Sequence, residues 1–337
     1  MSASQFHVFN SLASAIEPSV VCPQPTVRQL RLSVTDLCNF RCRYCMPAQG
    51  VAKLTHDEIL PLEAMAGLVG WLSAHAGIRR VRLTGGEPLV RSGICDLIRE
   101  IKAFPSIEEV TLTTNGSLLP RLAKELKAAG VSRVNISLDS LDRQRFAEIS
   151  RGADLGRVLA GIEAAREAGL TPIKLNAVLL RSSWREDVPA LLDYAAQNGF
   201  EIRFIELMRT GTERAWCESE FVSVDEVRQG LKAAITAVKE SSHAPAQRTL
   251  VNWRGKAMLV GWITPRSHPF CASCERLRLD ARGRLHRCLM DPTTLDLPRA
   301  LGSLENDAAK QEFDEYLAAK RPPALMDSSF AMSQIGG

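Results

Sequence analysis

Three cysteines stand close together in the first part of the chain, at Cys38, Cys42 and Cys45. Their C-x3-C-x2-C spacing puts three thiolates on one short loop, which suits three corners of a [4Fe–4S] cube. The fourth iron would then lack a protein ligand and could bind a substrate or a cofactor. The alternative is a structural zinc site, which needs a fourth ligand close by, and His56 is the nearest candidate.

A second set of three cysteines lies toward the other end, at Cys271, Cys274 and Cys288, in the spacing C-x2-C-x13-C. Three thiolates again have no obvious fourth partner, which favours a second open-iron [4Fe–4S] cluster. The alternative is a zinc knuckle completed by His268 or His286. A site needed only for folding would be closed, so two open sets indicate chemistry.

Composition limits the class of protein. Apolar residues make up 45% and charged residues 24% of the 337 residues, which is ordinary for a soluble globular protein of one large α/β unit with an appendage. We find neither a signal peptide nor an apolar run that would span a bilayer, and therefore expect a cytoplasmic protein. The net charge of +4 suits an anionic substrate such as a nucleotide but is too small for a nucleic-acid binder. Disulfides are not expected, and the remaining cysteines are Cys22, Cys95 and Cys217.

The elements that must hold the first set alternate between β-type runs and amphipathic helical stretches. Strands are expected at residues 29–34, 80–83, 109–113, 133–138, 172–180 and 201–207. Helices are expected at residues 62–75, 93–103, 119–129, 155–168 and 188–198, several of them ending at a glycine, namely Gly130, Gly169 and Gly199. This alternation predicts parallel βα units, and about six of them would form a partial (βα)6-type TIM barrel.

The pattern changes after residue 240. A polar linker is expected at residues 241–248, then short strands at 249–253, 257–263, 277–279 and 285–288, with a hairpin turn at 280–283. A last helix is expected at residues 304–320. The sequence thus predicts an N-terminal extension (1–27), a partial barrel (28–240) and a C-terminal domain for the second cluster (241–337).

The cysteine loop follows the first expected strand, and Thr84-Gly85-Gly86-Glu87-Pro88 follows the second. Together they resemble the signature pair of the radical S-adenosylmethionine (SAM) enzymes. The resemblance implies that SAM binds the open iron, and that an electron from the cluster cleaves SAM to a 5′-deoxyadenosyl radical. Glycines without Cβ atoms would let the backbone approach SAM closely. We expect the Glu87 carboxylate to be structural.

From about Arg31 to Gly337 the motifs resemble more closely the GTP 3′,8-cyclase family of molybdenum cofactor biosynthesis. This resemblance implies a lyase with two [4Fe–4S] clusters and SAM. The first cluster generates the radical, which takes the ribose C3′ hydrogen of GTP, and the second binds the guanine base. The C3′ radical attacks C8 of guanine and gives 3′,8-cyclo-7,8-dihydro-GTP, in the first step of molybdopterin biosynthesis.

The resemblance also implies roles for single residues. Positions that match SAM contacts of the family are Tyr44, Gly86, Ser137 and Met208. Positions that match GTP contacts are Arg31, Arg82, Thr113, Lys174, Arg276, Leu277 and Arg278. The terminal Gly336 and Gly337 match a family tail that reaches the active site and acts in catalysis with the first three cysteines.

Each of these positions has a simpler explanation. An arginine on a strand is usually an ion-pair partner, Thr113 and Ser137 can hydrogen-bond at strand ends, Met208 can fill the core, and a terminal Gly-Gly can fray. The cations lie on or beside different expected strands, and alternation could aim them into one cavity, where Arg and Lys would suit a triphosphate.

The implied partners are GTP, an external electron donor and the next enzyme of the pathway, cyclic pyranopterin monophosphate synthase, which would receive the product. A homodimer is one option for the oligomeric state. Two other functions stay open at this point. One is another radical SAM enzyme with an auxiliary cluster, such as a peptide or sulfatase maturase, although those usually carry more C-terminal cysteines. The other is a zinc-stabilised binding module without enzymatic activity.

Overall fold

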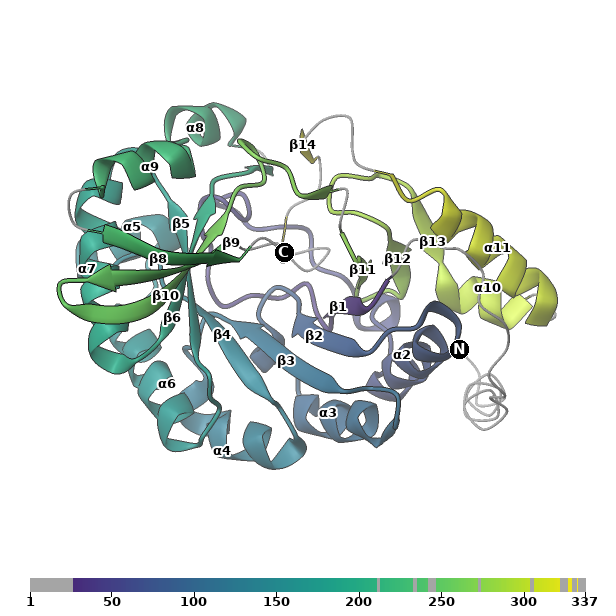
Figure 1. Cartoon of the computed structure of the whole chain (residues 1–337). Helices are drawn as coiled ribbons and strands as arrows, with labels where there is room; N and C mark the ends of the chain where they lie inside the picture. Colours follow the sequence, from purple (N-terminus) through teal and green to yellow (C-terminus); the bar gives the residue numbers. More distant parts are fainter. Residues whose placement is uncertain are drawn as a thin grey trace.

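The computed structural model describes residues 27–210, 213–232, 235–241, 247–271, 274–303, 306–321, 327–328 and 332. Parallel strands form the inner wall of an open barrel, and helices cover its outside (Figure 1). The wall consists of β1 (Gln29–Ser33), β2 (Arg80–Thr84), β3 (Glu109–Thr114), β4 (Arg133–Ser137), β5 (Lys174–Leu179) and β6 (Glu201–Glu206). The covering helices are α2 (Leu62–Ala76), α3 (Ile94–Ala103), α4 (Leu119–Ala129), α5 (Arg143–Ser150), α6 (Leu155–Glu167) and α7 (Trp184–Asn198).

Alternation along each strand separates a helix-facing side from a side that faces the barrel lumen. On β1, Leu30 and Leu32 are fully buried and belong to the hydrophobic core, and Arg31 between them points to the opposite face. Helix α2 completes the same core with Met65, which is also fully buried. The strands therefore place apolar side chains under the helices and leave the lumen to polar ones.

The C-terminal strands extend this sheet at both ends. Strand β10 (Lys256–Ile263) pairs parallel with β6, and β9 (Gln247–Trp253) and β8 (Ile235–Ser241) follow antiparallel. At the other end β11 (Arg276–Leu279) pairs parallel with β1, and β12 (Arg284–His286) and β13 (Thr294–Asp296) follow antiparallel. The result is one 12-stranded sheet in the order β13-β12-β11-β1-β2-β3-β4-β5-β6-β10-β9-β8.

Short elements complete the described chain. They are η1 (His56–Glu58), η2 (Pro88–Val90), β7 (Arg209–Thr210), α8 (Arg214–Ser219), α9 (Val224–Gly230), α10 (Leu297–Ser303), α11 (Asn306–Ala318) and β14 (Asp327–Ser328). Strand β14 pairs with β7, which brings a segment near the C-terminus back to the barrel.

The predicted fold class is confirmed. Each expected strand and helix of the barrel is present within a few residues of its predicted bounds, and the three glycines that end helices have the left-handed φ of a C-cap, 104° at Gly130 and 70° at Gly169 and Gly199. The expected linker is wrong at its edges: Ser241 belongs to β8, and residues 247–248 begin β9. Strand pairing outweighs the polar composition there, because β9 is held between two neighbours. The division into three domains stays a prediction, and β8 crosses its boundary at residue 240.

One helical stretch, His56–Ala76, is long and apolar enough to pass a membrane-span test by length and composition. This differs from the expectation that no such run exists. Half of its most apolar window is buried inside the protein, and Leu68 and Leu72 of α2 are fully enclosed by the core. Packing against the sheet therefore accounts for its apolar composition.

Candidate functional site

The first three cysteines lie on the loop that leaves the C-terminal end of β1. Helix α5, which the sequence did not predict, holds this loop: Ile149 and Ser150 at its end accept hydrogen bonds from the backbone of Arg43 and Arg41 at 3.0 and 3.2 Å. The next residue, Arg151, donates to the carbonyls of Arg41 and Met46 at 3.2 and 2.9 Å. The loop is thus fixed from outside the motif itself.

The three thiols lie close enough to influence one another. Burial raises the pKa of Cys42 well above its usual value, and Asp139, Cys45 and Cys38 raise it further. Burial likewise raises the pKa of the Cys38 thiol to about 11. Among the described residues, no three Cys, His, Asp or Glu side chains converge on a single-ion position. Three thiolates on one loop suit three corners of an iron–sulfur cube.

A cavity opens beside this loop. It is lined by Cys38, Cys42 and Cys45, and also by Tyr44, Gly86, Ser137 and Met208, the four positions predicted to contact SAM. Thr113, predicted to contact GTP, lines it from β3, and Asn176 lines it from β5. The structure therefore brings the predicted SAM positions together around one space. Their role in binding stays a prediction.

Gly86 lies where its backbone touches the cysteine loop. A Cβ atom there would stand 2.2 Å from the carbonyl oxygen of Leu37 and 2.7 Å from that of Asp36. The Gly86 N–H donates to the Thr35 carbonyl at 2.8 Å. Both partners are backbone and cannot move aside easily, so only glycine fits between this turn and the cysteine loop.

The two buried carboxylates near the cavity are held by hydrogen bonds. Glu87 accepts from the Thr114 hydroxyl and the Asn115 N–H, both at 2.7 Å, and burial raises its pKa to about 7. Asp139, which the sequence did not single out, accepts from the Tyr44 hydroxyl at 2.8 Å, and burial raises its pKa to about 6. Glu87 therefore ties the glycine turn to the end of β3, and Asp139 ties the cysteine loop to β4.

Arginines from three adjacent strands stand at one level of the lumen. Strand register places Arg31 of β1 between Arg278 of β11 and Arg82 of β2. Burial lowers the pKa of Arg31 well below its usual value, and Arg278, Arg276 and Arg82 lower it further. Burial also lowers the pKa of Arg82 to about 9 and that of Arg278 to about 10. The Arg31 Nε atom is buried and has no hydrogen-bond partner among the described residues.

A second group of cations gathers on the other side of the lumen. Lys174 of β5 pairs with Glu201 at 2.7 Å, and Arg203 of β6 pairs with the same carboxylate at 2.7 Å. Arg248 lies 3.6 Å from it. Burial, and then Arg203, lowers the pKa of Lys174 to about 8. The sequence predicted Lys174 but missed Arg203, although its place two residues after Glu201 on one strand was a signal that both face the lumen.

Leu277 differs from its neighbours on β11. Its side chain is fully buried in the hydrophobic core, while Arg276 and Arg278 lie on the opposite face. Of this predicted GTP-contact triplet, only the two arginine side chains and the Leu277 backbone can therefore face the lumen.

The first set of cysteines lies at the C-terminal end of β1, and the second set lies at the opposite end of the strands. Cys274 precedes β11, which runs parallel to β1. Cys288 follows β12, which runs antiparallel and returns to the end where β11 begins. Burial raises the pKa of Cys271, and Cys288 and Cys274 raise it further, so the three thiols lie close together. Burial also raises the pKa of Cys274, but Arg276 and Lys320 outweigh it and hold the value at about 7.

The histidines offered for a zinc knuckle are engaged elsewhere. Nε2 of His268 lies 2.7 Å from Asp225, and Nε2 of the buried His286 lies 3.2 Å from Asp280. These pairings favour an open set of three thiols over a closed zinc site.

The C-terminal segment reaches the first cavity. Met332 lines it, and its N–H donates to the Cys45 carbonyl at 3.3 Å. Gly336, Gly337 and Cys22 lie outside the described residues. Cys95 packs on the buried face of α3, and Cys217 is fully buried in α8.

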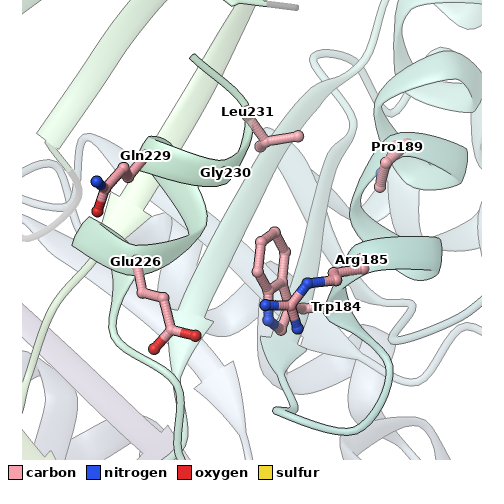
Figure 2. A pocket seen from close by; sticks show the side chains of 7 residues that line it. All are labelled: Trp184, Arg185, Pro189, Glu226, Gln229, Gly230 and Leu231. Atoms are coloured by element: carbon pink, nitrogen blue, oxygen red, sulfur yellow. The ribbon is translucent and has the colours of Figure 1, made fainter. Parts of the chain in front are cut away.

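A separate cavity lies between α7 and α9 and contains none of the predicted site residues (Figure 2). Its floor is the Trp184 ring, over which the Arg185 guanidinium stacks at 4.5 Å. Gly230 faces this ring, since a Cβ atom there would stand 2.4 Å from the indole edge. The Trp184 nitrogen has no exposed surface from which to reach a ligand.

Comparisons with known proteins agree with this geometry. The model of the radical SAM superfamily matches residues 32–195, and that of Molybdenum Cofactor Synthesis C matches residues 200–325. The solved structure of SuiB from Streptococcus suis bound to S-adenosylmethionine superposes with a TM-score of 0.63 at 16% identity, over 87% of this chain and 67% of that one. At that identity the similarity shows the fold alone.

Similar curated proteins extend over most of the chain. The GTP 3′,8-cyclase of Alkaliphilus metalliredigens is 38% identical, covering 93% of this chain and 98% of its own length. The enzymes of the same name from Pelotomaculum thermopropionicum and Pseudomonas putida are 43% and 46% identical, covering 82% and 84% of this chain and 86% and 85% of their own lengths. The chain therefore belongs to the GTP 3′,8-cyclase family within the radical SAM superfamily.

Proposed function

We propose that this chain is a GTP 3′,8-cyclase, which converts GTP to 3′,8-cyclo-7,8-dihydro-GTP in the first step of molybdopterin biosynthesis. One observation carries the proposal: two sets of three thiols lie at opposite ends of the parallel strands, with arginines of three adjacent strands between them. The first set, Cys38, Cys42 and Cys45, would hold one [4Fe–4S] cluster, and Cys271, Cys274 and Cys288 would hold the other. When bound, the first cluster and SAM supply a 5′-deoxyadenosyl radical that takes a hydrogen atom from the ribose of GTP.

The residues of the chain perform the binding and orienting steps. Tyr44, Gly86, Ser137 and Met208 would enclose SAM beside the first set of thiols. The second set would anchor the guanine end of GTP at the opposite end of the strands. A nucleotide held there would direct its ribose along the lumen toward the SAM cavity, which Thr113 lines.

The cations of the lumen would bind the triphosphate. Arg31, Arg82 and Arg278 repel one another across three adjacent strands, and an anion would relieve this repulsion. Lys174 and Arg203 share Glu201 and could turn toward a phosphate from the other side. A lumen with this excess of buried positive charge suits a polyanion better than the peptide of a maturase.

The remaining partners follow from this function. The reaction needs an external electron donor for the first cluster, and the product would pass to cyclic pyranopterin monophosphate synthase. We further propose a cytoplasmic location without nucleic-acid or membrane binding, and a homodimer as one possible assembly.

The direct test is anaerobic incubation of the iron- and sulfide-reconstituted protein with reductant, SAM and GTP. We expect 5′-deoxyadenosine and a cyclised GTP product to form together. Binding of about eight irons per chain would exclude the zinc-stabilised module. Absence of both products would refute the proposal, and SAM cleavage without cyclised GTP would point to another radical SAM activity.

A further inference from the structure

Asn115, directly after β3, lies between the two motifs that surround the first cavity. Its backbone N–H donates to Glu87 of the glycine turn at 2.7 Å. The preceding Thr114 donates its hydroxyl to the same carboxylate at 2.7 Å. Glu87 is 1% exposed, so these bonds are shielded from water and fix the backbone of Asn115 against β2.

The side chain of Asn115 has a defined orientation. Its Oδ1 atom accepts from the N–H of Ser117 at 3.0 Å and from the Ser117 hydroxyl at 2.7 Å. With the oxygen held there, the NH₂ group must face the cysteine loop. It donates to Asn39 Oδ1 at 2.8 Å, and Asn39 in turn donates to the Ser117 hydroxyl at 2.9 Å.

Asn39 stands next to Cys38, whose sulfur accepts a hydrogen bond from the Phe40 N–H at 3.3 Å. Cys38 and Asn115 line the same cavity, and burial raises the pKa of the Cys38 thiol while the Asn115 amide lowers it by less. A carboxylate of the same shape could not donate the bond to Asn39. The site therefore uses the donor capacity that asparagine has.

We propose that Asn115 is a positioning residue that orients Cys38 as a ligand of the first cluster, by donating its amide hydrogens into the cysteine loop. The inference rests on the proposed assignment of that cluster to Cys38, Cys42 and Cys45. Groups that hydrogen-bond a metal ligand orient it and tune the metal, and a donor to a cluster thiolate favours the more negative, reduced state. Because Asn115 is also bound to Glu87, it would couple the geometry of the cluster loop to that of the glycine turn.

The test compares Asn115→Ala and Asn115→Asp with the wild-type holoenzyme, reconstituted anaerobically. Asn198→Ala is the matched control, because Asn198 is an exposed asparagine at the end of α7 that contacts only a backbone carbonyl of its own helix among the described partners. The measurements are the rate of iron loss to a chelator, the midpoint potential, and the EPR spectrum of the reduced cluster with and without SAM. Thermal unfolding shows whether each variant is folded.

We expect the first cluster of Asn115→Ala to lose iron about tenfold faster than wild type, as loss of a group that supports a ligand typically does. Its midpoint potential should move to a more negative value, and its SAM-dependent EPR change should weaken. Asn115→Asp keeps the shape and the acceptor, loses the donors and adds a negative charge, so its effects should be at least as large as those of Asn115→Ala. Asn198→Ala should match wild type.

A wild-type iron-loss rate, potential and EPR spectrum in Asn115→Asp would overturn the inference, since a merely structural role requires only shape. If Asn115→Ala does not fold, Asn115→Asp alone decides. A wild-type protein whose EPR spectrum does not respond to SAM would instead contradict the proposed function on which the inference rests.

Discussion

Arg31 and Arg278 lie directly beside each other on parallel strands, although they come from opposite ends of the described chain. Arg278 is buried and Arg31 is half-buried, and each lies close to further arginines that lower its pKa. Two adjacent guanidiniums with so little access to water destabilise the ligand-free fold unless an anion lies between them. Their pairing is therefore the strongest structural sign of where a triphosphate binds.

Replacing Arg31 with methionine should weaken GTP binding and yet stabilise the ligand-free protein. Removal of one charge relieves the repulsion, so the ligand-free variant should melt at a higher temperature than wild type. Loss of a charge-assisted partner should raise the Kd for GTP about tenfold or more. Calorimetry measures both quantities. Arg185→Met, at the separate cavity of Figure 2, is the control and should leave GTP binding unchanged. A variant that binds GTP like wild type would exclude Arg31 from the binding site.

GTP affinity should fall as the pH rises above about 8. The pKa of Lys174 is lowered from its usual 10.5 to about 8 by burial and by Arg203, so the ligand-free chain loses this charge just above neutral pH. A triphosphate favours the protonated form, so binding above pH 8 takes up a proton, and the Kd should rise by up to about tenfold per pH unit. Lys174→Arg keeps its charge and should flatten the profile between pH 7 and 9. If the Kd for GTP depended on pH in the same way in wild type and in Lys174→Arg, Lys174 would not be the group responsible.

Cys288→Ala should remove one cluster and leave the other. Iron content should fall from about eight to about four per chain, because each [4Fe–4S] cube holds four irons. GTP binding and turnover should be lost while SAM still binds, whereas Cys38→Ala should abolish SAM cleavage. Iron analysis, EPR and product assays report on each. Normal cyclisation of GTP by Cys288→Ala would make the second site merely structural.

Gly86→Ala should damage SAM binding without unfolding the chain. The added Cβ would meet the carbonyls of Leu37 and Asp36, and overpacking of this kind costs about 1–3 kcal/mol, so the Kd for SAM should rise about tenfold. Gly302→Ala is a suitable control, because a Cβ atom there meets nothing within 4 Å. Equal SAM affinities in the two variants would show that the fit of Gly86 against the cysteine loop does not matter for SAM binding.

Deletion of Gly336 and Gly337 should lower cyclase turnover while leaving iron content unchanged. The basis is Met332, which lines the first cavity a few residues before the end of the chain. A tail that begins there is long enough to enter the lumen. Assays of 5′-deoxyadenosine and cyclised GTP should show SAM cleavage uncoupled from product formation. Full turnover by the shortened chain would show that these glycines form a frayed terminus without a role in catalysis.

The amino-acid sequence by itself determined the features that depend on neighbours along the chain. The spacing of each cysteine set, the glycines that end helices and the alternation of Leu30, Arg31 and Leu32 are covalent properties, and they predicted the clusters, the barrel units and a polar lumen. Helix α5 was missed because it is short and follows the strand β4 without a long amphipathic pattern.

Tertiary structure decided which distant segments meet. The C-terminal strands looked like one appended domain, but β10 joins β6 and β11 joins β1 at opposite ends of a single sheet. Strand partners so far apart in sequence are chosen by backbone pairing and burial of the core, which no local pattern records. The same pairing of distant strands places Arg278 beside Arg31. The curvature of the sheet brings the loops at the strand ends together, and with them Asn115 and Cys38.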